Sequence, residues 1–294
     1  MKFLMLINPS SKGGRGVRLL PRYRSELDKR KIDRTEIILS SIDEAFERAG
    51  NLDSTLYDAV VAVGGDGTIR AVGAGLLANP DPALKLGVLY TGTSPDFCRT
   101  HNIPLVPDKA VTCLAEGFTR QIFVLTANGN PFFCSCNPGM GAEVAACANK
   151  LRPFLGDFAG TLTALAGALL KNRRYTFKVN GTLLDDCNHL LITRMPFIAS
   201  GLKLALPELK EEEYLLWYLQ DVSRFKWLQI LLKLYRKQPC GSWKIFSAPL
   251  MIESPSHGDL PLEYDGDPHG TLPLEIKFAP RRLNLIVPAG DKLK

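Results

Sequence analysis

The sequence lacks any hydrophobic run long enough to cross a bilayer. Its longest apolar tract, residues 158–170, falls well short of the roughly 20 residues that a spanning helix needs. The start holds one lysine and a short apolar run before Asn8 and Pro9, which argues against a signal peptide and favours a buried first strand. We therefore expect a cytoplasmic protein with no segment that crosses a membrane.

Paired cysteine spacings are also missing. The seven cysteines are odd in number and scattered, and the four histidines are dispersed. This pattern excludes a regular zinc site and a disulfide framework. Reduced cysteines packed in a core fit best.

The chain has no internal repeat, no low-complexity linker and no strong charge of either sign. Its formal charge of +6 and pI near 8.9 favour contact with phosphates of a nucleotide, a nucleic acid or an anionic membrane. No nucleic-acid recognition module is present, and the basic residues are not interleaved with aromatic ones. We therefore expect no nucleic-acid partner.

Strand-like apolar runs alternate with amphipathic segments at the beginning of the chain. The runs cover residues 2–7, 35–39, 59–63, 85–90 and 121–127. This alternation predicts an α/β fold, a doubly wound and mostly parallel sheet with helices on both faces. Residues 1–127 are the expected nucleotide-binding domain.

The sequence pattern changes after Ala127. Asn180-Gly181 and Asp265-Gly266 stand between alternating runs, a strong hairpin signal. Residues 128–282 are therefore expected to form a mostly antiparallel, β-rich acceptor domain, with helices near 143–151, 159–171 and 224–237. Whether residues 283–294 return to the first domain is left open.

A glycine-rich loop interrupts the pattern at Gly64-Gly65-Asp66-Gly67-Thr68. It follows a predicted central strand and precedes a predicted helix, so it lies at the sheet edge where such folds bind ligands. Glycines let backbone N–H groups approach a phosphate, and an aspartate there suits a magnesium ion or acid–base chemistry. An ordinary Asp-Gly turn is the alternative.

Neither familiar phosphate-binding fingerprint matches this chain. The loop at residues 10–16 has no Gly-Lys-Ser/Thr ending, and Leu19 stands where a Rossmann loop has its third glycine. Polar residues nevertheless end two further strands, at Asn8 and at residues 91–96. Three neighbouring strand ends thus carry candidate ligand loops.

Taken together, the motifs resemble the diacylglycerol kinase catalytic family, lipid kinases that share a fold with NAD kinases and phosphofructokinases. The matching segments are Asn8-Pro9, Gly64 to Thr68, Gly92-Thr93 with Asp96-Phe97, Gly139 to Val144, and Asp265-Gly266-Asp267 before Leu272-Pro273-Leu274.

The resemblance implies ATP as phosphate donor and a lipid acceptor that enters between the domains. ATP would be held by Asn8, Ser40, Gly64, Gly65, Gly67, Thr68, Gly92 and Thr93. Asp66 and Asp96 would be the acidic groups near Mg²⁺ and the transferring phosphate. Asp267 would be the general base, and Glu213 stands where the family has an aspartate that holds a structural magnesium.

Four departures from the family pattern put catalysis in question. Arg70 and Ala71 replace a segment that usually carries a carboxylate, and Pro95 replaces an asparagine. Glu213 and Tyr214 stand where aspartate and glycine are expected. Asp267 replaces the family's glutamate and has one methylene less reach; a polar hairpin turn explains that aspartate equally well.

Three functions remain open at this point. The first is an ATP-dependent lipid kinase with a diacylglycerol-like acceptor. The second keeps the loops but phosphorylates NAD, as in the related NAD kinases. The third is a nucleotide- or lipid-binding module without turnover, which the departures suggest.

Basic and amphipathic segments suggest peripheral contact with an anionic membrane surface, on its inner face. Lys12, Arg15, Arg18, Arg22 and Arg24 cluster early in the chain, and residues 224–237 combine an apolar face with lysines, arginines and a tryptophan. Ordinary core packing explains the apolar face of 224–237 and is the favoured interpretation. A homodimer is left open.

Overall fold

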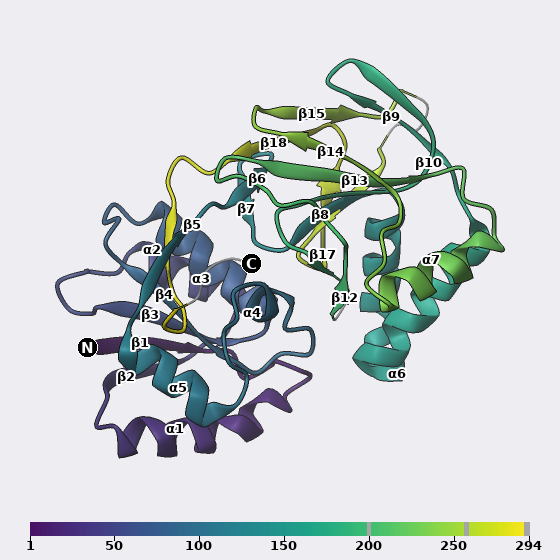
Figure 1. Cartoon of the computed structure of the whole chain (residues 1–294). Coiled ribbons are helices and arrows are strands. Elements are labelled where there is room, and N and C mark those ends of the chain that lie inside the picture. Colours follow the sequence, from purple (N-terminus) through teal and green to yellow (C-terminus); the bar gives the residue numbers. More distant parts are fainter. Residues whose placement is uncertain (199–200, 256–258, 291–294) are drawn as a thin grey trace. The chain divides into compact units, whose positions relative to one another are not determined.

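A six-stranded sheet forms from the apolar runs of the first part of the chain. In the computed structural model, which describes residues 1–198, 201–255 and 259–290, its strand order is β2-β1-β3-β4-β19-β5 (Figure 1). The strands are β1 (Lys2–Ile7), β2 (Asp33–Ile38), β3 (Ala59–Gly64), β4 (Lys85–Tyr90), β5 (Thr119–Ile122) and β19 (Leu283–Ile286). All neighbours are parallel except β19 and β5. The central strands are apolar throughout because helices cover both of their faces.

Helices flank this sheet as a doubly wound fold requires. They are α1 (Leu20–Lys29), α2 (Ile42–Gly50), α3 (Asp66–Ala78), α4 (Asp96–Thr100) and α5 (Pro107–Glu116), with a short 3₁₀ helix at Gly16–Leu19. Helix α1 packs with α5, and α2 packs with α3. Figure 1 shows these two pairs on opposite faces of the sheet.

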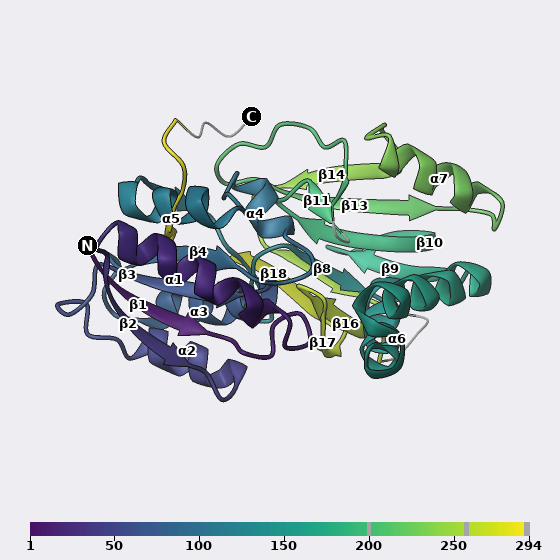
Figure 2. The ribbon, with the colours of Figure 1, turned by 90° about the horizontal axis from the view of Figure 1, so that it is seen from below.

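An eleven-stranded antiparallel sheet builds the other half of the chain (Figure 2). Its order is β17-β16-β8-β10-β9-β15-β18-β6-β7, and β13 pairs with β10 and β14. The strands are β6 (Leu125–Ala127), β7 (Asn130–Phe132), β8 (Ser135–Pro138), β9 (Tyr175–Val179), β10 (Thr182–Thr193), β13 (Tyr214–Gln220), β14 (Ser242–Phe246), β15 (Leu250–Glu253), β16 (Pro261–Tyr264), β17 (Asp267–Thr271) and β18 (Leu274–Phe278). A separate small sheet pairs β11 (Phe197–Ile198) with β12 (Leu202–Lys203). The predicted fold class, a parallel α/β sheet followed by a mostly antiparallel β-rich part, is confirmed.

Two helices accompany the antiparallel sheet, α6 (Met140–Lys171) and α7 (Lys226–Tyr235). The segments predicted as separate helices near 143–151 and 159–171 are two halves of α6, which is interrupted at Gly156, where φ is 75°. Both predicted hairpins form, because Val179 pairs with Thr182 and Tyr264 pairs with Asp267.

The chain divides into two compact units that the strand pairing defines. Unit 1 is Met1–Val124 with Ala279–Lys294, and unit 2 is Leu125–Phe278. The single strand expected over residues 121–127 is instead two strands, because β5 pairs with β19 in unit 1 while β6 pairs with β18 in unit 2. The strand that supplies the hydrogen bonds therefore decides to which unit each of these two strands belongs.

None of the helices in the described ranges combines the length and apolar character that crossing a membrane would demand. All seven cysteines are free thiols, and four of them are buried: Cys98, Cys113, Cys136 and Cys187.

Arg281 ties the returning C-terminal segment to α3. Its guanidinium donates hydrogen bonds to the carbonyl oxygens of Leu76, Leu77 and Asn79, which are the orphan acceptors at the end of that helix. A cation there is also favoured by the helix dipole. The side chain of Asn79 in turn donates to the carbonyls of Ala49 and Leu52, at 3.1 and 3.0 Å.

We expect Arg281→Leu to lower the free energy of unfolding of unit 1 by about 2 kcal/mol, because buried carbonyls lose charge-assisted hydrogen bonds. Urea unfolding followed by circular dichroism would measure the change. Arg22→Leu is the matched control, since Arg22 is exposed and surface changes stay within about 0.5 kcal/mol. Equal stability of the two variants would contradict the assigned role.

Candidate phosphate-binding site and the acidic hairpin

Three loops of unit 1 meet because their strands are neighbours in the sheet. Asn8 follows β1, Gly65 follows β3 and Thr91 follows β4, in the order β1-β3-β4. The Nδ2 of Asn8 donates to Oγ1 of Thr68 at 2.9 Å, and the Thr91 N–H donates to the Gly64 carbonyl at 2.8 Å. These bonds join the three loops at one sheet edge and bring the predicted ligand residues Asn8 and Thr68 into direct contact.

Glycines allow the backbones of these loops to approach closely. A Cβ on Gly92 would lie 2.5 Å from the Gly65 Cα atom and 2.6 Å from the hydroxyl of Tyr90, and a Cβ on Gly64 would overlap Thr68. A Cβ on Gly16 would lie 2.7 Å from the Thr91 carbonyl oxygen. A side chain at these positions would fill the space between the loops. The edge is therefore lined by main chain, as phosphate cradles are.

Ser11 is a candidate ligand that sequence reasoning missed. The residue is only 7% exposed, its Oγ makes no hydrogen bond within the described part of the chain, and this atom lies 3.8 Å from the position that a Cβ on Gly65 would take. A buried hydroxyl without a partner is costly unless a ligand or water satisfies it. In the sequence, Ser11 is marked only by its place in the loop after Asn8. That loop matches neither of the two familiar phosphate-binding fingerprints, so no sequence pattern singles out Ser11.

Asp66 is the first residue of α3 and lies half-buried beside the other loops. Its Oδ2 accepts a hydrogen bond from the Tyr90 hydroxyl at 3.4 Å. Burial raises the pKa of the Cys98 thiol, and the nearby Asp66 carboxylate raises it further. Cys98 belongs to α4, so the negative charge of Asp66 is felt at that helix.

Asp96 begins α4 and is buried, with 6% of its surface exposed. Its carboxylate pairs with Arg99 at 3.3 Å. The helix follows the loop that carries Gly92 and Thr93, and Thr93 is exposed. Unit 1 therefore presents two carboxylates, Asp66 and Asp96, on elements that begin at the loops after β3 and β4.

Ser40 takes part in a local cap. Its N–H and its hydroxyl both donate to Oε2 of Glu44 at 2.7 Å. These bonds, with the ion pair to Arg48, lower the pKa of Glu44 to about 2. The contact stabilises the start of α2, and the predicted nucleotide contact of Ser40 remains a prediction.

Strands β16 and β17 of unit 2 form a hairpin that carries Glu263, Asp265 and Asp267, which we call the acidic hairpin. Asp265 holds this hairpin to a neighbouring loop. Its carboxylate accepts hydrogen bonds from the N–H groups of Phe133, Cys134 and Ser135, at 2.8, 2.6 and 3.3 Å. Asp267 begins β17 on the other side of the turn and is half-exposed. The hairpin is therefore held by its first aspartate, and the second is, like the first, half-exposed.

Glu263, two residues before this turn, was not anticipated as a site residue. It is 6% exposed, its Oε2 accepts the Gly266 N–H at 2.8 Å, and Asn137 donates to its other oxygen. Burial raises the pKa of Glu263 to about 8, and Asp265 and Asp267 add to the effect. The sequence signal, an acid between the apolar residues of a strand, is visible only in hindsight.

Glu213 sits in a turn that is already hydrogen-bonded. Its Oε2 accepts the Lys210 N–H at 2.9 Å. The neighbouring Tyr214 is fully buried, and its hydroxyl donates to the Ala248 carbonyl at 2.6 Å. Within residues 1–198, 201–255 and 259–290, no three His, Cys, Asp or Glu side chains gather as metal ligands would.

Comparison with known proteins places these loops in context. Residues 2–127 match the family model described as the diacylglycerol kinase catalytic domain. A diacylglycerol kinase from Staphylococcus epidermidis is 30% identical over 157 residues, 53% of this chain and 49% of that protein. A Pseudomonas aeruginosa protein named "Probable lipid kinase YegS-like" is 38% identical over 110 residues, 37% of this chain and 36% of that protein. The alignments thus span half or less of these curated relatives.

A solved structure extends the likeness to both units. A diacylglycerol kinase from Bacillus anthracis superposes with a TM-score of 0.69 and 14% identity, covering 98% of this chain and 97% of that one. At this identity the likeness shows the fold alone. Glu213 and the hairpin at Asp265 lie outside the segment that the family model matches.

The buried Glu263 predicts a pH dependence of stability. Between its ordinary pKa of 4.5 and its native pKa of about 8, the folded state holds a proton that the unfolded state has lost, so stability falls as pH rises. Glu263→Gln removes this effect. We expect the stability of the variant relative to wild type to increase from pH 5 to pH 8, by up to about 3.5 kcal/mol.

Urea unfolding at the two pH values measures this difference. Glu253→Gln, on the exposed surface of β15, is the matched control and should show no such trend. A constant difference between Glu263→Gln and wild type would show that the carboxyl titrates normally.

Proposed function

Residues 2–127 belong to the diacylglycerol kinase catalytic domain family, as the motifs predicted, and on this basis we propose that the chain is a lipid kinase. It would transfer the γ-phosphate of ATP to the hydroxyl of a diacylglycerol-like lipid. The observation that carries the proposal is the backbone-lined edge formed by Gly64, Gly65 and Gly92, with Asp66 beside it.

The phosphates of ATP would bind to main-chain N–H groups at the start of α3. The amides of Asp66 and Gly67 precede the first helical hydrogen bonds, which run from Thr68 and Ile69 to the Gly65 carbonyl. Such leading amides favour anions. The buried Ser11 hydroxyl next to Gly65 supports the same role, since a phosphate oxygen would give it a hydrogen-bond partner.

The residues present fit a magnesium ion that arrives with the nucleotide. Mg²⁺ is usually held by one or two carboxylates together with substrate phosphates, and Asp66 and Asp96 offer such oxygens. When bound, the ion would neutralise charge on the phosphates during transfer. Glu213 remains a proposed ligand of a second, structural ion.

Asp267 is the proposed general base. Its carboxylate would accept the proton of the lipid hydroxyl as that oxygen bonds to the γ-phosphorus and the bond to the bridging oxygen of ADP breaks. Asp265 and Glu263 fix the turn on either side through backbone N–H groups. A turn held in this way supports the proposal that the Asp267 carboxylate has a fixed position, as a general base needs.

A binding module without turnover is the second candidate, and Tyr214 favours it. Where the family has a glycine in a metal-binding loop, this tyrosine is a core residue whose burial raises its pKa. Pro95 and the buried Ala71 add to the departures around the nucleotide. ATP binding in calorimetry without transfer to any lipid would select this candidate.

We expect Asp66→Asn to reduce lipid phosphorylation by at least about 100-fold, because it removes charge where the metal and phosphates meet. Transfer of labelled phosphate from ATP to diacylglycerol in mixed micelles measures the effect. Asp43→Asn, an exposed acid in the first turn of α2, is the matched control. Full activity of Asp66→Asn, or transfer to NAD and to no lipid, would refute the proposal.

Asp267→Asn should lower kcat about 100-fold or more, because the proton acceptor is lost. Asp267→Glu keeps a base and should retain most activity. Asp185→Asn, on the exposed part of β10, should behave as wild type. An unchanged kcat in Asp267→Asn would assign the base to another residue.

A further inference from the structure

Helix α7 presents apolar side chains on two sides. Trp227 and Leu234 are buried and pack into the core of unit 2. A second stripe points to solvent: Phe225, Leu228, Leu232 and Tyr235 are 91%, 66%, 45% and 78% exposed. Their spacing of three, four and three residues places them along one side of the helix. Core packing, the favoured interpretation from sequence, accounts for only the first set.

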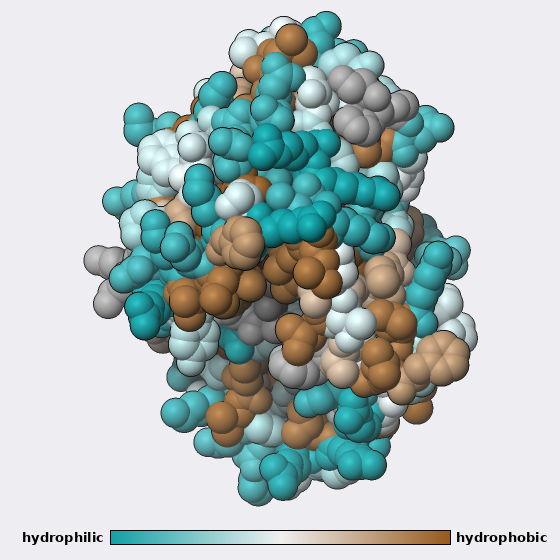
Figure 3. Space-filling model, turned by 90° about the vertical axis from the view of Figure 1, so that its right-hand side faces the viewer, coloured by the Kyte–Doolittle hydropathy of each residue, from teal (hydrophilic) through white to brown (hydrophobic). Residues whose placement is uncertain are grey.

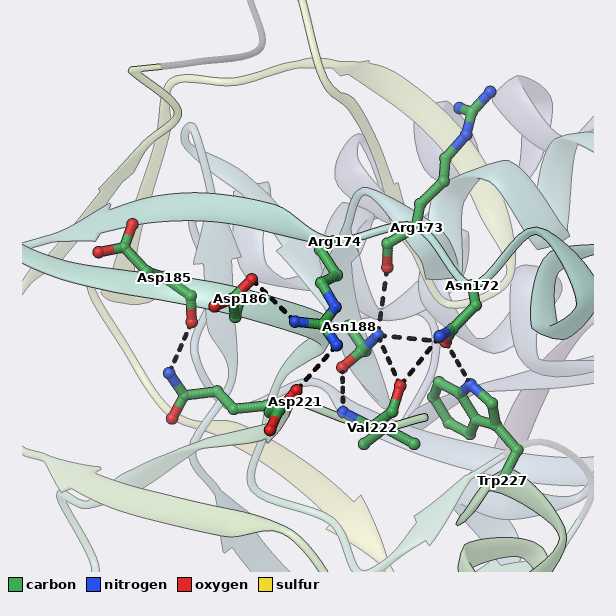
Figure 4. Close-up of polar contacts among 10 residues, drawn as sticks. Asn172, Arg173, Arg174, Asp185, Asp186, Asn188, Asp221, Val222 and Trp227 are labelled. Atoms are coloured by element: carbon green, nitrogen blue, oxygen red, sulfur yellow. Dashed lines mark hydrogen bonds and ion pairs between the residues drawn. The ribbon is translucent and has the colours of Figure 1, made fainter. Parts of the chain in front are cut away.

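Polar contacts hold α7 in this orientation (Figure 4). The Nε1 of Trp227 donates to Oδ1 of Asn172 at 2.7 Å, and the fully buried Asn188 donates to the same oxygen at 3.2 Å. Asn188 also accepts the Val222 N–H at 2.7 Å, just before the helix. Turning the exposed stripe inward would leave these buried groups without partners, at considerable cost.

An unusual charge pattern surrounds the exposed stripe. Between Asp221 and Glu253 the sequence has six lysines and arginines and no acidic residue. Five of these cations lie at or beside α7 and are exposed: Arg224, Lys226, Lys233, Arg236 and Lys237. Within the part of the chain that the structure describes, none of the five has an ion-pair partner.

A pocket of about 340 Å³ follows one flank of the same helix. Lys226 and Lys233 line it together with Gln229 and the β14 residue Ser242. These side chains offer ammonium, amide and hydroxyl donors, which suit a phosphate group. Figure 3 looks at the side where α6 and α7 lie in Figure 1 and shows apolar surface bordered by strongly hydrophilic surface.

We propose that α7 is a membrane-docking helix, whose stripe from Phe225 to Tyr235 enters the interface of an anionic lipid surface while its lysines and arginines bind headgroup phosphates. An apolar stripe beside cations is the pattern of helices that lie in such interfaces. An acidic protein partner would match the charge equally well. The choice of a membrane rests on the proposed function, because a lipid acceptor resides there.

The strength of each contribution can be anticipated. A lysine or arginine near an anionic leaflet improves binding about fivefold, so removing two should weaken it about 25-fold. Removing two apolar side chains of the stripe should weaken binding at least tenfold. Because exposed lysines are screened by salt, the first effect should shrink in high salt, whereas the second should persist.

Vesicle co-sedimentation of the full chain tests the proposal directly. Vesicles of phosphatidylcholine with one third phosphatidylglycerol should bind the wild type, and pure phosphatidylcholine should bind it far less. Lys226→Gln with Lys233→Gln and Phe225→Ala with Leu228→Ala should each lose binding. Lys31→Gln with Lys109→Gln and Leu56→Ala with Phe118→Ala are matched controls, since all four residues are exposed in unit 1.

Three results would overturn the proposal: no binding of the wild type to anionic vesicles, binding by the α7 variants equal to that of the controls, or a dimer that depends on the stripe and excludes vesicles. Kinase activity on a short-chain, water-soluble diacylglycerol separates this proposal from the previous one. The α7 variants should retain that activity, whereas absence of transfer in the wild type with intact vesicle binding would refute the kinase alone.

Discussion

The close approach of bare backbone at the ends of β3 and β4 is the constraint on which the candidate site depends. Gly65 and Gly92 lie so near each other that a Cβ on Gly92 would fall 2.5 Å from the opposite Cα atom. The contact brings the start of α3, with its leading amides and Asp66, against the loop that leads into Asp96. These loops meet only because β1, β3 and β4 lie side by side in the buried sheet. The packing that forms the core of unit 1 therefore also positions the residues of the candidate site.

In unit 2 the constraint is different, because a short hairpin of β16 and β17 carries the half-exposed carboxylate of Asp267. Three backbone N–H groups satisfy Asp265, and Gly266 and Asn137 satisfy Glu263. These hydrogen bonds anchor the turn through the half-exposed Asp265 and the buried Glu263, and Asp267 follows the turn at the start of β17. Burial is the main reason why the pKa of Glu263 is raised, and the neighbouring Asp265 and Asp267 raise it further.

Local sequence patterns predicted much of this arrangement, and particular residues show where they stopped. Strands β1 and β4 and both hairpins follow from apolar runs and from Asn-Gly and Asp-Gly turns. The expected strand at residues 121–127 was wrong as a single element, because its halves hydrogen-bond to β19 and β18. Hydrophobicity gives no information about which of two distant partners a strand will choose. Ser11 and Glu263 were missed because their importance comes from burial, which their neighbours in sequence do not reveal.

By itself, the sequence determined the α/β class, the strand-end loops and the match of residues 2–127 to the diacylglycerol kinase catalytic domain, because alternation, glycine motifs and their order are local properties of the chain. Only the tertiary structure decided that Ser11 is buried beside Gly65, that Tyr214 is core, and that α7 turns half of its apolar residues to solvent. These outcomes depend on which groups, distant in the sequence, pack against each residue in the fold. Helical periodicity shows that α7 is amphipathic, but the hydrogen bond from Trp227 to Asn172 selects the face that packs.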